Sequence, residues 1–192
     1  MKNTKIMKKS LLLLTLLLMV TALSACSLFN TQEAQEEKAE VESNYEGVLS
    51  ATGIDLPAPE GAVEVEYSYY NLDPMMAEMD FELNGSDYTL RVQKSTLTSL
   101  EFSPDDQLDA DALRENYGDI SGEYYKWDAI ASVVVQDCTG YYAVNNKHCA
   151  IVNWLDTTTG YMYSLCYDEE NAVQDVVVQV ADLVFGVTRQ TA

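Results

Sequence analysis

Strict alternation of apolar and polar side chains marks two segments of the chain, residues 63–69 and 77–83. A period of two places the apolar side chains of a strand on one face, so each segment predicts a β-strand with one buried face. Asn84-Gly85 follows the second segment, and this dipeptide suits a type I′ turn, whose two central residues need positive φ. The alternation resumes at residues 88–92, which predicts a return strand and therefore a β-hairpin.

The turn also predicts the register of this hairpin. A two-residue Asn-Gly turn places Leu83 opposite Ser86. The pairs that follow are Phe81 with Tyr88, Met79 with Leu90 and Ala77 with Val92 on the apolar face, and Glu78 with Arg91 on the other. A slip by one residue would turn acidic side chains into the core, so the hydrophobic pattern and the turn favour the same register.

The remaining pattern predicts the fold class. Five further segments rich in Val, Ile, Tyr and Trp have the composition of strands: 124–127, 130–135, 141–144, 149–155 and 161–167. Asn44 is placed to cap a short helix that ends at residues 49–51. Beyond residue 169, apolar residues recur at three- and four-residue spacing and predict a C-terminal helix: Val173, Val176, Val177, Val180, Leu183 and Val184. We expect an α+β domain: an antiparallel sheet of about seven or eight strands, connected as a meander of hairpins, with the C-terminal helix packed on one face and a short N-terminal helix.

An acidic segment, residues 105–119, lies between the two groups of strands. It predicts a short helix through Asn116 that ends at Gly118. A calcium loop that begins at Asp109 is a poor match, because its fifth position is Leu113 and no glycine follows. We therefore expect a solvated acidic surface here.

The N-terminus has the pattern of an export signal. Four lysines and no acidic residue precede or accompany an apolar stretch, Leu11–Leu23, that is too short to span a bilayer. The stretch ends in Leu23-Ser24-Ala25-Cys26, which resembles the cleavage site of bacterial lipoproteins. The resemblance implies a signal peptide at 1–25 and a diacylglycerol on the Cys26 thiol, which anchors the protein to the extracellular face of the cell membrane. The alternative is an ordinary secretory signal with an incidental cysteine.

Charge and composition divide the rest of the chain. The sequence has 31 acidic and 11 basic residues, a net charge of −20. Removal of residues 1–25 takes four basic and no acidic residues, so the mature chain is more acidic still. This balance argues against nucleic acid as a partner and predicts repulsion from anionic lipid headgroups. Residues 26–43 are polar and Glu/Gln-rich, which predicts a flexible acidic tether before a single extracytoplasmic domain at 44–192.

Three cysteines follow the predicted anchor: Cys138, Cys149 and Cys166. If Trp154 lies opposite Tyr161, then Cys149 lies directly opposite Cys166, and the two thiols are placed to form a disulfide in an exported protein. A shift in the loop register removes this coincidence, and Cys138 would be a buried free thiol. The spacing of these cysteines and His148 matches no zinc pattern, so we expect no metal and no cofactor.

The domain resembles a family of uncharacterised lipoproteins of Gram-positive bacteria. The same pattern occurs in a domain of unknown function on the outer side of membrane-bound regulators that resemble anti-sigma factors. The resemblance is carried by Pro59-Glu60-Gly61-Ala62, residues 81–85 with Tyr88 and Arg91, Asp119-Ile120-Ser121-Gly122, Tyr124, Tyr125 and Trp127, and Trp154 with Asp156, Gly160, Tyr163, Ser164 and Leu165. It implies an antiparallel sheet with a packed helix and no established activity.

No catalytic grouping stands out in the sequence. We therefore expect a non-catalytic binding or sensing module at the membrane surface, whose ligand is a protein, a peptide or a cell-wall component. The alternative is a carrier or quality-control lipoprotein that binds lipid or an exported protein, which requires a large apolar cavity between sheet and helix. An enzyme ranks third, because the carboxylates alternate along the polar faces of the strands without a marked pair.

Overall fold

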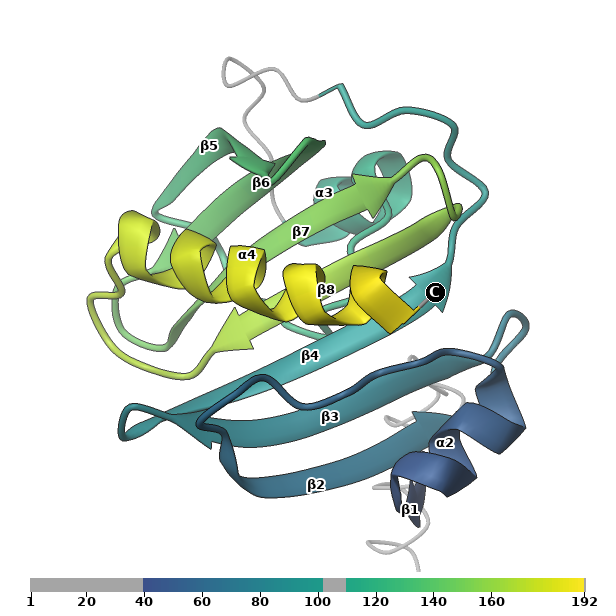
Figure 1. The fold of residues 1–192 in the computed structure, drawn as a ribbon. Helices are drawn as coiled ribbons and strands as arrows, with labels where there is room; N and C mark the ends of the chain where they lie inside the picture. The colour runs from purple at the N-terminus through teal and green to yellow at the C-terminus, as the bar shows by residue number, and fades with distance from the viewer. Residues whose placement is uncertain (1–39, 102–109, 192) are drawn as a thin grey trace, which may run out of the picture. The chain divides into compact units, whose positions relative to one another are not determined.

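The computed structural model describes residues 40–101 and 110–191 (Figure 1). The chain divides into two units, residues 1–38 and 39–192, and the second contains every described residue. The predicted signal peptide, Cys26 and the tether up to residue 39 lie outside the described residues. None of the helices described is long and apolar enough to cross a membrane.

The domain is built on one eight-stranded antiparallel sheet, as the hydrophobic pattern predicts. Its order is β1-β2-β3-β4-β8-β7-β6-β5, so two groups of consecutive hairpins join where β4 pairs with β8 (Figure 1). The strands are β1 (Glu40–Ser43), β2 (Val63–Tyr70), β3 (Met76–Leu83), β4 (Ser86–Lys94), β5 (Ala129–Val135), β6 (Cys138–Asn145), β7 (Cys149–Asp156) and β8 (Tyr161–Tyr167).

The predicted register of the β3–β4 hairpin is confirmed. Leu83 faces Ser86, and each of the predicted pairs up to Ala77 with Val92 is present. Both turn residues adopt positive φ, 56° at Asn84 and 82° at Gly85. Turn chemistry and apolar alternation therefore agree on one pairing.

The predicted helices are also present. Helix α2 (Tyr45–Thr52) begins after Asn44, whose side chain accepts a hydrogen bond from the Gly47 amide at 2.8 Å. Helix α4 (Gln174–Thr191) packs on the sheet against β5, β7 and β8. The acidic segment forms helix α3 (Ala110–Tyr117), and residues 102–109 lie outside the described part of the chain.

One predicted boundary, the end of the tether, and one predicted strand, residues 124–127, are wrong. Residues 40–43, assigned to the tether, pair with the outer edge of β2 as strand β1. Four residues with two glutamates carry no recognisable apolar alternation, so the pairing is visible only once the neighbouring strand is in place. Residues 124–127 have no regular secondary structure; Tyr125 and Trp127 instead pack over a sheet face, which explains their strand-like composition.

The predicted register of β7 and β8 is wrong by two residues. Trp154 faces Tyr163, and Asp156 is the residue that faces Tyr161. The Asp156 carboxylate accepts hydrogen bonds from the Thr158 amide and the Thr159 hydroxyl, both at 2.9 Å, so the strand extends to Asp156 before the chain turns. Local bonding of an aspartate to the backbone two residues on is typical of turns.

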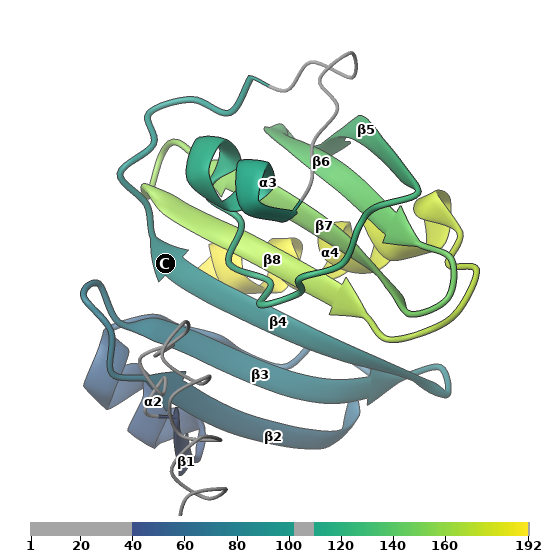
Figure 2. The same cartoon turned by 180° about the vertical axis from the view of Figure 1, so that it is seen from behind.

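The two ends of the sheet differ in how they are covered. One cluster lies on the first face. It contains residues of helices α2 and α4 and the apolar residues that each strand from β2 to β8 directs to that face. A second cluster, which includes α3 and the segment around Trp127, covers β6, β7 and β8 on the other face (Figure 2). No described residue of β2, β3 or β4 belongs to that second cluster. We call β6–β8 the covered half and β2–β4 the open half.

Candidate functional site

A row of polar side chains crosses the whole sheet on the face that α3 covers in part. The strand registers place one member of the row on each strand, in the order Glu42, Ser68, Glu78, Arg91, Ser164, Asn153, Tyr141 and Ser132. The five members Ser68, Glu78, Ser164, Asn153 and Tyr141 are buried. Buried polar groups are retained only where they are hydrogen-bonded or paired, so this row is the first place to look for chemistry.

An ion pair between Glu78 and Arg91 lies at the open half of the row. The Glu78 carboxylate also accepts hydrogen bonds from the Ser68 hydroxyl at 3.1 Å and the Tyr70 hydroxyl at 3.2 Å. Burial and the neighbouring Glu78 charge raise the pKa of Tyr70 to about 12. Arg91 donates as well to the Ser121 carbonyl. Gly122 has φ 78°, a left-handed conformation that favours glycine, and a Cβ there would lie against the Arg91 guanidinium.

Asp119 holds the other end of the same segment on the sheet. Its carboxylate accepts from the Ser121 amide at 2.9 Å and from the Asn153 side chain at 3.0 Å, and Asn153 also donates to the Tyr141 hydroxyl at 2.7 Å. Burial raises the pKa of Asp119 and, more strongly, that of Tyr141. The row therefore fastens residues 119–122 across β4, β7 and β6. Two of its buried atoms, the Asn153 amide oxygen and the Ser164 hydroxyl oxygen, have no hydrogen-bond partner among the described residues.

The predicted disulfide residues lie near each other but not directly opposite. Cys166 faces Ile151, and Cys149 lies two residues before Ile151 in β7, on the same face of the sheet. The three cysteines 138, 149 and 166 are free thiols and buried. A hydrogen bond with Cys149, together with burial, raises the pKa of Cys166 far above the usual range of a thiol. Such a thiol is a poor nucleophile, because the thiolate is the reactive form.

The residues considered for a metal do not converge. Cys138 belongs to the cluster on the first face and Cys149 to the cluster on the second. His148 is exposed and stacks on Tyr125, with ring centroids 4.3 Å apart. Within residues 40–101 and 110–191, no group of three or more His, Cys, Asp or Glu side chains is arranged to hold a metal ion.

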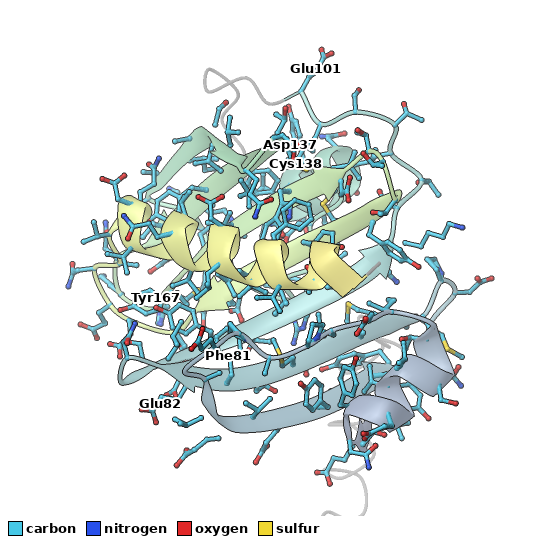
Figure 3. All side chains as sticks on the ribbon, viewed as in Figure 1. Phe81, Glu82, Glu101, Asp137, Cys138 and Tyr167 are labelled. Carbon is cyan, nitrogen blue, oxygen red and sulfur yellow. The ribbon has the colours of Figure 1, made fainter. Side chains whose placement is uncertain are left out.

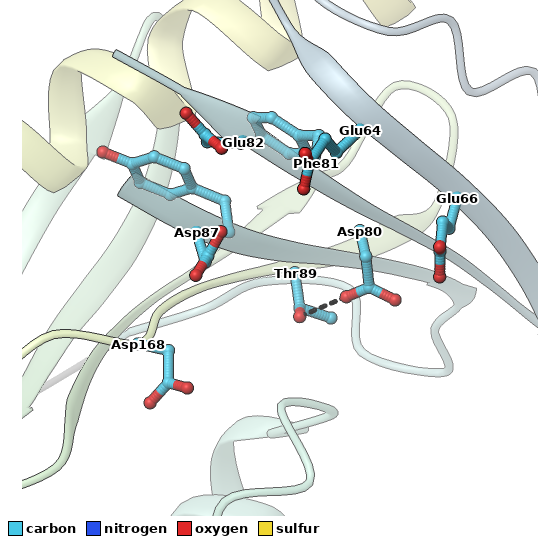
Figure 4. A pocket seen from close by; sticks show the side chains of 9 residues that line it. Glu64, Glu66, Asp80, Phe81, Glu82, Asp87, Thr89 and Asp168 are labelled. Carbon is cyan, nitrogen blue, oxygen red and sulfur yellow. Dashed lines mark hydrogen bonds between the residues drawn. The ribbon is translucent and has the colours of Figure 1, made fainter. Parts of the chain in front are cut away.

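An acidic cleft opens on the open half, on the second face of the β3–β4 hairpin (Figure 4). Its volume is about 290 Å³, and six carboxylates line it: Glu64, Glu66, Asp80, Glu82, Asp87 and Asp168. Asp80 accepts a hydrogen bond from the Thr89 hydroxyl at 2.5 Å, and burial raises the pKa of Asp80. No lysine or arginine lines the cleft, so it presents concentrated negative charge to solvent.

A groove of about 430 Å³ lies on the first face, between α4 and the end of the β3–β4 hairpin. Its apolar wall consists of Leu83, Tyr88, Tyr167, Val176, Val180 and Leu183. Asn84, Ser86 and Gln179 add amide and hydroxyl groups, and no charged residue lines it. The volume falls in the range of ligand-binding pockets.

Three stacked aromatic rings form the floor beside this groove. Phe81 stacks on Tyr88 with centroids 5.4 Å apart, and Tyr88 stacks on Tyr167 at 5.0 Å. Figure 3 places Phe81 and Tyr167 in the region between α4 and the β3–β4 hairpin. Phe81 and Tyr88 are buried in the core, and the half-buried Tyr167 is the ring that borders the groove.

The groove exposes part of the predicted helical stripe. Val177 and Val184 are buried against the sheet, but Val176 is 44% exposed and Leu183 is 41% exposed. The apolar stripe of the helix is therefore wider than the sheet can cover. This extra width is the only feature of the sequence that indicates the groove. The sequence assigned Tyr88 to the core and gave Tyr167 no role beyond its strand.

No protein-family model, curated protein or solved structure shows significant similarity to this chain.

Proposed function

We propose that this chain is a lipid-anchored extracytoplasmic protein, moored through Cys26, whose domain is a non-catalytic binding module. The lipobox-like sequence Leu23-Ser24-Ala25-Cys26 supports the anchor. In this proposal, the polar, Glu/Gln-rich sequence that follows Cys26 is the tether between lipid and domain. Two acyl chains suffice for stable anchoring, since each buried methylene contributes about 0.8 kcal/mol.

The observation that carries the binding role is the groove beside α4. It combines a stacked aromatic floor with two half-exposed aliphatic residues, Val176 and Leu183, in a chain rich in acidic side chains. Apolar side chains left unburied on a folded domain cost free energy in water and are commonly covered by a partner. We infer that the ligand is a polypeptide segment that buries them.

The carrier alternative is less well supported. It requires a deep apolar cavity between sheet and helix. Beneath α4 that space is filled by Phe185, whose ring contacts Trp154 at 5.8 Å and Tyr163 at 5.2 Å between centroids. The groove is the space left at the open end of this packing, and amide and hydroxyl groups interrupt its apolar wall.

The anchor is tested by cell fractionation. The wild-type chain is expected in the membrane fraction with a diacylglycerol-modified cysteine detectable by mass spectrometry. The Cys26→Ala variant is expected in the medium or as uncleaved precursor. If that variant still fractionates with membranes, the anchor is wrong.

Binding at the groove is tested by photo-cross-linking in the producing cell. A photoreactive amino acid at position 183 is expected to give a discrete cross-linked product. The same amino acid at position 115, exposed on α3, serves as the matched control and is expected to give none. Equal labelling from both positions, or no product from position 183, would contradict a binding role for the groove.

A further inference from the structure

The polar groups of the groove narrow the chemistry of its ligand. Asn84 and Gln179 carry amides and Ser86 a hydroxyl, set among aliphatic and aromatic side chains. The Ser86 hydroxyl already lies 3.4 Å from the Tyr167 hydroxyl, within the groove itself. A pure hydrocarbon ligand would strip water from these groups without replacing its hydrogen bonds. A peptide backbone supplies both donors and acceptors, so a polypeptide satisfies them.

The charged residues that line the neighbouring cleft are all acidic. Leu83 and Ser86 line the groove, and their chain neighbours Glu82 and Asp87 line the cleft, so the two surfaces meet around the end of the hairpin. Tyr167 and Asp168 are consecutive, the first in the groove and the second in the cleft. Burial, Tyr167 and the charge of Glu169 raise the pKa of Tyr88, so a further carboxylate lies close to the groove. No lysine or arginine lines either surface.

We propose that the groove and cleft together bind a cationic amphipathic segment of another protein. Its apolar side chains lie on Tyr167 and on Val176 and Leu183 of α4, and its lysines or arginines reach the carboxylates of Asp87 and Asp168. This inference rests on the binding function proposed above and adds the chemistry of the partner. The cleft alone would attract any cation, and the groove alone any apolar segment; their junction at the end of the β3–β4 hairpin selects a ligand that has both properties.

The two surfaces play different physical roles in this complex. Burial of the aromatic floor and aliphatic stripe supplies most of the affinity and slows dissociation. The carboxylates steer the partner and raise the association rate, an effect that salt screens over a Debye length of about 10 Å at 0.1 M. Binding is therefore expected to weaken with salt but to persist at high salt.

Three synthetic peptides of equal length test the chemistry directly: one of Leu and Lys, one of Leu and Glu, and one of Ser and Lys. The full chain is purified from membranes into zwitterionic nanodiscs, with empty nanodiscs as the blank, so that lipid charge does not bind the lysines. The Leu/Lys peptide is expected to bind at least about tenfold more tightly than either of the others, because only it matches both surfaces.

Two pairs of substitutions separate the contributions of groove and cleft. Val176→Gln with Leu183→Gln replaces half-exposed apolar residues by a good helix former, and should lower affinity for the Leu/Lys peptide about tenfold or more at every salt concentration. Asp87→Asn with Asp168→Asn should lower it about three- to tenfold at low salt and have no effect at high salt. Asp111→Asn with Glu115→Gln on α3 makes the same charge change away from the groove, and should change affinity less than about twofold.

The outcomes distinguish this inference from the function on which it rests. Three results would overturn the cationic amphipathic ligand. The Leu/Glu peptide could bind as tightly as the Leu/Lys peptide, or none of the three peptides could bind. Alternatively, the Ser/Lys peptide could bind with an affinity that Val176→Gln with Leu183→Gln does not change. A cross-link at position 183 to a partner segment without lysine or arginine would do the same while leaving the binding module intact. No cross-link at position 183 would overturn both.

Discussion

The covered half and the open half of this sheet use the same strand geometry for different purposes. In the covered half, β6–β8 are packed by α4 on one face and by the α3 cluster on the other. Trp154 and Leu165 on the first face and Ile151 on the second are all 0% exposed. In the open half, the first face is packed in the same way, but the second carries the carboxylates of the acidic cleft. One half is a core element and the other presents a surface.

This difference places both candidate binding surfaces at one end of the molecule. The groove and the cleft meet at the end of the β3–β4 hairpin, where the open half borders β8. The covered half supplies a rigid support, and the buried Glu78–Arg91 pair joins the two halves through the Ser121 carbonyl. Binding sites placed on the margin of a rigid scaffold are common, since the scaffold holds their geometry.

The largest expected effect compares one aromatic residue from each half. Trp154→Ala should lower the free energy of unfolding by about 5 kcal/mol, because its ring is enclosed by Tyr163 and Phe185 and the cavity cannot collapse. Phe81→Ala should cost less, about 3 kcal/mol, because solvent in the adjoining cleft can fill the space. Urea unfolding measures both. An equal or greater cost for Phe81→Ala would contradict the difference between the halves.

The second prediction concerns the ion pair between Glu78 and Arg91. Glu78→Ala should cost about 2–3 kcal/mol, since it leaves Arg91 without its counter-charge in a mostly buried setting. The double variant Glu78→Ala with Arg91→Ala should cost less than the sum of the single variants, because the unpaired charge is then absent. A double-mutant cycle from urea unfolding gives the coupling free energy. Strict additivity would show that the two charges are not energetically coupled.

The third prediction concerns pH. Burial raises the pKa of Asp119 in the folded state above its ordinary value of 3.8. The folded state then holds the proton more tightly, so this group's stabilising contribution is full below 3.8 and is lost as the pH rises through the raised pKa. The thermal midpoint should therefore increase through this group as the pH falls from neutrality through the raised pKa of Asp119, and Asp119→Asn should reduce that increase. Asp111→Asn, at an exposed site, is the control, and an identical slope in both variants would contradict the assignment.

The smallest effect compares two turn glycines with the same conformation. Gly85 in the open half has φ 82° and Gly160 in the β7–β8 turn has φ 75°, and a Cβ at either would meet no other atom within 4 Å. Gly85→Ala and Gly160→Ala should each cost about 1 kcal/mol, the penalty of a left-handed conformation. Only Gly85→Ala should also weaken Leu/Lys peptide binding. Equal weakening by both variants would mean that the hairpin end is not the binding site.

Most of the fold was predictable, because its signals are local. The β3–β4 hairpin is specified by Asn84-Gly85 and by alternation within about ten residues on either side, so one segment contains all the information. The β7–β8 register could not be predicted, because it depends on whether Asp156 ends its strand or enters the loop. That choice is made by its hydrogen bonds to Thr158 and Thr159, which composition does not reveal.

The candidate site was not predictable for a different reason. The groove joins Leu83 and Tyr88 of the hairpin to Tyr167 of β8 and Leu183 of α4, which are distant in sequence. Each of these residues fits a core position when its own element is considered alone. Leu83 and Tyr88 are indeed buried, and only the packing of α4, which buries Val184 and leaves Leu183 half exposed, opens the groove beside them.

Hydrogen exchange tests the central claim most directly, that the end of the open half is the binding surface. Amide exchange of the full chain in zwitterionic nanodiscs is compared with and without saturating Leu/Lys peptide. Slower exchange is expected in residues 81–88, 167–169 and 176–183, with no change in β6 and β7. Protection that appears in β6, β7 or α3 instead, or nowhere in the domain, would contradict the account.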